Sequence, residues 1–158
     1  MIRLGALSLA LNTMLLSVVA ATVALAELKP LNETLSTQTE KSYEYLRCAA
    51  FYTANLEWAG TQLSEEVYST TRQLASSLLT VAILVRSSTN DADFTIISAA
   101  VLKDTRAVAD LYLEQFRGAY AQKGNAWSGN QLWESDATYC KPVGAAASEL
   151  VSSMETSK

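Results

Sequence analysis

The fold is decided by residues 43–63, whose sequence is YEYLRCAAFYTANLEWAGTQL. Apolar and small side chains recur there at positions i, i+3, i+4 and i+7, the spacing that places them on one face of an α-helix. The members of this stripe are Tyr45, Cys48, Ala49, Tyr52, Leu56, Ala59 and Leu63. The pattern predicts an amphipathic helix that turns Cys48 toward the core.

The ends of this first helix carry local signals. Thr37 and Glu40 have the spacing of a capping box, in which a hydroxyl and a carboxylate satisfy the free N–H groups of the first turn. We therefore expect the helix to begin near Thr37. Gly60 interrupts the pattern and costs about 1 kcal/mol relative to alanine inside a helix. The interruption predicts a break, with the next helix beginning near Thr61 or Ser64.

Two further long helices are predicted downstream. Residues 62–86 keep a helical stripe for several turns, which favours a helix over a buried strand at the apolar run 78–85. A polar segment at 87–90 ends it. The next helix is expected to begin near Asp91 or Asp93, where a carboxylate can cap the first turn, and to end at Lys123 because Gly124 suits a left-handed C-terminal cap.

The last predicted helix is short. Pro142 suits a first turn, so we expect this helix to begin just after Cys140 and to cover 144–154, with fraying at 155–158. Residues 27–36 are predicted to be an extended lead-in. The fold class is therefore all-α: an up-down bundle of about four helices, forming one domain over residues 37–154.

Residues 1–26 have the layout of a secretory signal peptide. Arg3 supplies the positive start, an uncharged and mostly apolar run follows, and Ala24 and Ala26 provide small residues at the cleavage site. We expect cleavage before Glu27 and an exported protein, periplasmic or extracellular. The alternative is an uncleaved membrane anchor, because the uncharged run is just long enough to cross a bilayer.

Export determines how the two cysteines are interpreted. In an oxidising compartment, an even pair of thiols in a small domain usually forms a disulfide. Cys48 and Cys140 are the only cysteines, so one intramolecular pairing exists. On the chain-entropy model, closing so long a loop stabilises the fold by roughly 4 to 5 kcal/mol, which is an upper value. The alternative is two unpaired thiols packed as small apolar groups.

The composition excludes several kinds of chemistry. The chain has no histidine, which removes histidine-based triads, ordinary zinc and di-iron bundle sites and histidine-ligated haem. No glycine-rich phosphate loop and no nucleophile elbow occur. The net charge of −4 and the lack of a basic cluster argue against nucleic acid as a partner. We therefore expect no metal and no cofactor, and assign no catalytic residue.

A few residues remain as candidate contacts for a ligand or partner. Trp127 and Trp133 lie six positions apart beside a polar turn, where they can form an aromatic platform or cap the end of a bundle. Asp104 falls on the apolar stripe of its helix. A buried carboxylate has a raised pKa unless it is paired, although a hydrogen bond from a neighbouring tyrosine or arginine is the more ordinary role.

Two functional classes follow, with a variant of the first. The favoured prediction is a non-catalytic exported protein of binding or accessory type, whose partner is an unknown protein or small ligand. The alternative is a carboxylate-based hydrolase or lyase that uses two of Glu57, Glu66 and Asp104, which would require two of these acids about 5 to 9.5 Å apart in one pocket. If the leader is retained, the protein is instead a membrane-tethered subunit of an envelope complex.

Overall fold

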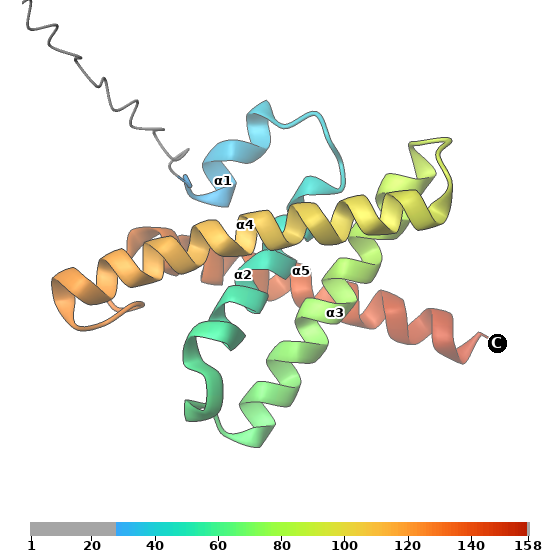
Figure 1. The fold of residues 1–158 in the computed structure, drawn as a ribbon. Helices are drawn as coiled ribbons and strands as arrows, with labels where there is room; N and C mark the ends of the chain where they lie inside the picture. Colours follow the sequence, from blue (N-terminus) through green and yellow to red (C-terminus); the bar gives the residue numbers. More distant parts are fainter. Residues whose placement is uncertain (1–27, 158) are drawn as a thin grey trace, which may run out of the picture.

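The computed structural model describes residues 28–157, and within that range every regular element is helical, which confirms the all-α class (Figure 1). The predicted signal peptide, residues 1–26, lies outside the described residues. The described part contains five α-helices where about four were expected. In chain order the elements are α1 (Leu31–Thr34), η1 (Leu35–Thr37), α2 (Tyr43–Ala59), η2 (Gly60–Gln62), α3 (Glu65–Ser88), α4 (Phe94–Lys123) and α5 (Gln131–Thr156).

The long helices are arranged in layers around a central hairpin. Helices α2 and α3 run antiparallel and pack along each other, and α4 crosses one face of this hairpin while α5 crosses the other (Figure 1). The four long helices therefore do not simply run up and down around one axis. The middle layer is covered from both sides, which is why its first helix contributes so much of the core.

Helix α2 is buried around its whole circumference near its N-terminal end. Six consecutive residues, Leu46 to Phe51, are buried. Consecutive residues point in all directions around a helix, so this segment must be surrounded by neighbours rather than covered on one face. The prediction of a single inward stripe is therefore corrected. Cys48 does lie in the core, whereas Tyr52 and Leu56 of the predicted stripe are only partly buried.

Several predicted helix ends are confirmed. Gly60 ends α2 with φ +52°, and Ser64 caps α3 by accepting a hydrogen bond of 3.4 Å from the Val67 amide. Asp93 caps α4 through the Thr95 amide at 2.8 Å. Gly124 ends α4 in the left-handed conformation, with φ +68°. These ends were predictable because each depends on one residue type and its immediate neighbours.

The N-terminal boundary of the first long helix was predicted wrongly. Helix α2 begins at Tyr43, and the segment expected to be an extended lead-in contains α1 and η1. The proposed capping box does not form, because the Thr37 hydroxyl donates back to the Thr34 carbonyl at 2.9 Å and Glu40 pairs instead with Arg86 of α3. Tertiary partners therefore outweigh the local signal.

Helix α5 is longer than predicted at both ends. It begins at Gln131, where the Asn130 side chain caps it, and it includes residues 155 and 156, which were expected to fray. Pro142 lies inside this helix rather than at its start. Proline removes one backbone hydrogen bond, but the helix is packed two residues before and two residues after it, at the buried Cys140 and Gly144, and continues through it. At Gly144 an added Cβ would lie 3.2 Å from the Leu74 side chain, so glycine permits this close approach of α5 to α3.

Candidate functional site

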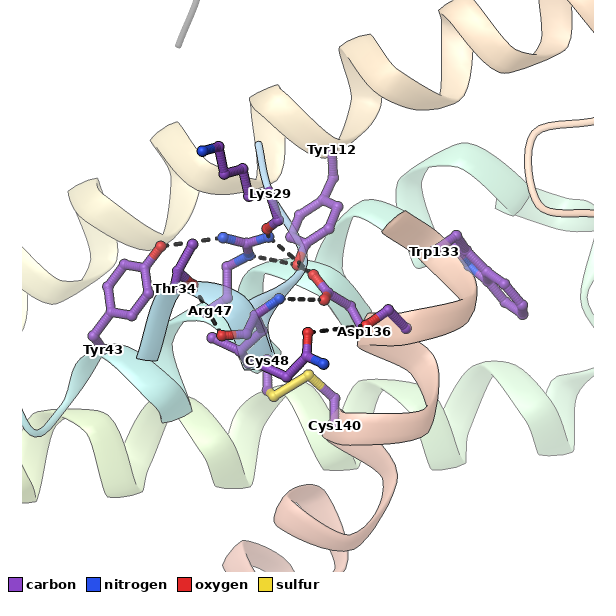
Figure 2. Close-up of polar contacts among 12 residues, drawn as sticks. Lys29, Thr34, Tyr43, Arg47, Cys48, Tyr112, Trp133, Asp136 and Cys140 are labelled. Atoms are coloured by element: carbon purple, nitrogen blue, oxygen red, sulfur yellow. Dashed lines mark hydrogen bonds and ion pairs between the residues drawn. A yellow bond between two sulfur atoms is a disulfide. The ribbon is translucent and has the colours of Figure 1, made fainter. Parts of the chain in front are cut away.

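A charged cluster is enclosed where α2, α4 and α5 meet (Figure 2). We call Arg47, Tyr112 and Asp136 the buried charge cluster. The side chains of Arg47 and Asp136 are 1% and 0% exposed, and Arg47 Nη2 lies 2.9 Å from Asp136 Oδ2. Arg47 Nε donates to the Tyr112 hydroxyl at 2.6 Å, and that hydroxyl donates in turn to Asp136. Each of the three side chains thus bonds to the other two.

The buried charge cluster also holds the N-terminal segment in place. Arg47 Nη2 donates to the Lys29 carbonyl at 2.7 Å, and the Leu31 amide donates to Asp136 Oδ1 at 2.7 Å (Figure 2). A helix of four residues is too short to be stable alone. Helix α1 therefore forms because Asp136 accepts a hydrogen bond from its free N-terminal amide. Its first residue, Leu31, is also fully buried in the core.

Burial and the interactions within the cluster together determine its protonation. Burial by itself lowers the pKa of Arg47, but the interactions with Tyr112, Asp136 and Tyr43 outweigh this, so its pKa is raised. Burial raises the pKa of the Tyr112 phenol well above its ordinary value. At neutral pH the guanidinium is therefore charged and the phenol is neutral. Because all three side chains are enclosed, the cluster presents no surface to a substrate.

The predicted disulfide is confirmed and lies beside the buried charge cluster. Cys48 and Cys140 are bonded, their Cα atoms are 5.3 Å apart, and both are fully buried. The sequence did not lead us to predict the buried charge cluster, although the charged residues near the two cysteines pointed to it. Arg47 directly precedes Cys48, and Asp136 precedes Cys140 by about one helical turn. The signal was not recognised because the last helix was expected to begin after Cys140.

The candidate acids do not form a common site. Asp104 is 49% exposed and accepts a hydrogen bond of 2.7 Å from Arg86 of α3, so the expectation of a buried carboxylate is wrong while the arginine partner is confirmed. Glu57 pairs with a different arginine, Arg106, and Glu66 is exposed in the first turn of α3. Among residues 28–157, no group of three or more potential metal ligands occurs.

The two candidate tryptophans do lie together. Their ring centroids are 6.3 Å apart, with the planes tilted by 38°, and both side chains are half-buried. Trp133 Nε1 donates to Asn55 Oδ1 of α2 at 2.8 Å. The indole N–H of Trp127 is enclosed and has no hydrogen-bond partner within the described chain. The pair thus has one satisfied donor and one that is enclosed without a partner.

These tryptophans line a groove of about 340 Å³, which we call the aromatic groove. Three helical segments contribute to it, and residues about one turn apart line each side. Its walls are formed by Phe51, Tyr52, Asn55 and Ala59 of α2, by Leu63, Val67 and Thr71 at the start of α3, and by Trp127, Trp133, Ala137 and Lys141 in and before α5. Trp133 points away from the buried charge cluster (Figure 2).

The aromatic groove is mainly apolar, with very few polar groups. Lys141 is the one charged side chain among its lining residues. Ligand sites typically combine apolar and aromatic walls with a small number of polar groups, in volumes of about 300 to 1,000 Å³. The aromatic groove has this composition, and its volume lies at the lower end of that range.

A larger and more polar groove of about 1,110 Å³ lies between the N-terminal segment, α4 and the start of α5. Its lining includes Glu33, Glu114, Gln115, Gln122 and Lys123. Water solvates such a surface well, so a ligand gains little by displacing it. We therefore regard the smaller, aromatic groove as the better candidate site.

The chain matches no protein-family model, no curated protein and no solved structure with which it was compared. Function therefore has to be argued from the geometry of the candidate site. Between residues 28 and 157, no helix combines the length and apolarity needed to cross a membrane.

Proposed function

We propose that this chain is an exported, non-catalytic binding protein whose ligand occupies the aromatic groove. The observation that carries the proposal is the convergence of three helical segments on a mainly apolar space lined by Trp127 and Trp133. Burying apolar surface there gives a favourable free energy of roughly 25 cal/mol for each Å² removed from water. The rigid indole rings lose little conformational entropy on binding.

The exported location is supported by two independent features. The N-terminal residues have the layout of a signal peptide, and Cys48 and Cys140 form a disulfide. Disulfides persist mainly in oxidising compartments such as the periplasm and the extracellular space. The ion pairs of Glu57 and Asp104 with separate arginines favour a structural use of these acids over the carboxylate-based hydrolase or lyase.

The test is a titration with N-phenyl-1-naphthylamine, a neutral aromatic probe whose fluorescence rises in apolar surroundings. We expect saturable binding of one probe per protein. Replacing Trp133 with alanine should weaken binding by about tenfold or more, because a large apolar contact surface is lost. Trp58→Phe is the matched control, because Trp58 packs against Phe116 and Tyr120 outside the aromatic groove.

A second variant separates loss of the site from loss of folding. Ala137→Phe fills the aromatic groove without removing any existing side chain, and we expect it also to abolish probe binding while the circular dichroism spectrum stays helical. Absence of saturable binding to the unmodified protein would contradict the proposal. Equal affinity in the wild-type protein and in a folded Ala137→Phe variant would contradict it as well.

A further inference from the structure

We infer that the aromatic groove selects a small amphipathic anion, with an apolar or aromatic body and a single acidic group that pairs with Lys141. This inference rests on the proposed function and specifies its ligand class. It follows from the position of Lys141, the one cation among the residues that line this mainly apolar groove. Neither the aromatic rings nor the cation would define this class alone.

Some cationic side chains in the described part of the chain are already engaged, whereas Lys141 shares its lack of an ion pair with others such as Lys103 and differs from them by lining the aromatic groove. Arg47, Arg86 and Arg106 form ion pairs with carboxylates, and Lys123 donates to the Gly129 carbonyl. Lys141 has no ion-pair partner among residues 28–157. A ligand carboxylate or sulfonate would therefore not have to compete with an acid of the protein.

The surroundings of Lys141 on its own helix strengthen this point. Residues three and four positions apart are neighbours on a helix surface. At those positions α5 carries Ala137, Thr138, Gly144 and Ala145, none of which is acidic. No acidic residue lines the aromatic groove from α2 or α3 either. On a protein with a net charge of −4, this is a local positive site at the edge of an apolar surface.

The row of groove residues on α5 sets the order of chemical groups along the ligand. Trp133, Ala137 and Lys141 follow one another at intervals of four residues, so they span about 12 Å along the helix axis. The indole ring lies at one end and the ammonium at the other, with a small alanine between them. An apolar body packed against Trp133 would thus place an acidic group near Lys141.

The size of the site favours a small molecule over a segment of another protein. The aromatic groove has a volume of about 340 Å³, which matches a compact ligand. Stable protein–protein contacts usually bury more than about 1,000 Å² in total.

The test compares two probes that share one ring system. N-phenyl-1-naphthylamine is neutral, whereas 8-anilino-1-naphthalenesulfonate carries one negative charge. We expect the anion to bind about fivefold more tightly at low ionic strength, as a partly exposed ion pair can provide, and to lose this advantage as salt is added. Lys141→Gln should remove the preference, so that the two probes bind the variant with similar affinity.

Lys103→Gln is the control, because it removes the same charge from an exposed position on α4 and should alter neither affinity. Equal affinities for the two probes in the wild-type protein would overturn the inference, and so would a preference that survives Lys141→Gln. Either result, with the neutral probe still bound, leaves the proposed function standing. Failure of the neutral probe to bind would instead reject the proposed function and the inference together.

Discussion

Two adjacent rows of side chains on α5 have opposite characters. One row contains Asp136 and Cys140, both fully buried, and fixes α5 to the central helix α2. The other row is displaced by one residue, or about 100° around the helix, and contains Trp133, Ala137 and Lys141 at the open aromatic groove. The same helix thus carries a sealed polar surface and an accessible apolar one.

This contrast reverses the usual expectation that polar groups face water and apolar groups face the core. The sealed row can contain the charge of Asp136 because this carboxylate is paired with Arg47 and hydrogen-bonded. The open row leaves aromatic surface partly accessible, and exposed apolar patches often mark a binding site. We therefore expect substitutions in the sealed row to reduce stability, and substitutions in the open row to reduce binding.

The largest expected effect comes from breaking the buried charge cluster. Arg47→Ala leaves Asp136 enclosed without its cation, and we expect a loss of about 3 to 5 kcal/mol in the free energy of unfolding. Urea denaturation followed by circular dichroism measures this loss. The double variant Arg47→Met with Asp136→Leu should recover part of it, because no unpaired charge then remains. A loss below about 1 kcal/mol for Arg47→Ala would show that the cluster is less important than its burial indicates.

Removing the disulfide should have the next largest effect. Replacing both Cys48 and Cys140 with alanine should lower the free energy of unfolding by about 2 to 4 kcal/mol, since the unfolded chain regains the freedom that the cross-link had removed. Urea denaturation of the oxidised wild-type protein provides the reference. We expect the folded variant to bind N-phenyl-1-naphthylamine as the wild-type protein does. A parallel loss of affinity would contradict the separation between the two rows.

The smallest expected effect is at Asp104, which belongs to neither row. Its carboxylate pairs with Arg86 at an exposed position, so Asp104→Asn should change the free energy of unfolding by less than about 1 kcal/mol. Thermal unfolding and a probe titration measure stability and binding. Loss of probe binding in a folded Asp104→Asn protein would restore this residue as a candidate contact for the ligand.

Much of the fold was predictable because many of its determinants are local. Gly60, Asp93 and Gly124 define helix ends through their own conformations and neighbouring amides. The disulfide followed from the count of cysteines and the expected compartment. The tryptophan pair was recognised as a candidate, but its groove also depends on α2 and α3, whose contributions could not be inferred from spacing near Trp127 and Trp133.

The features that were not predicted depend on contacts between residues that are far apart in the sequence. The lead-in becomes helical only because Asp136 and Arg47 bind its backbone, and these partners lie far from it in sequence. Pro142 resembled a helix start because its local preference is strong, yet tertiary packing keeps it inside α5. A charged residue next to a predicted disulfide cysteine is a usable signal, because an enclosed charge requires a partner nearby.

The hydrogen bond between the Leu31 amide and Asp136 has a consequence for how the chain folds. It joins residues 105 positions apart, so α1 cannot dock until the beginning of α5 is present and in place. Contacts between such distant residues slow folding, because the intervening chain must be ordered before the contact forms. During synthesis, the N-terminal segment can therefore dock only after residues as far along the chain as Asp136 have been made and folded into α5.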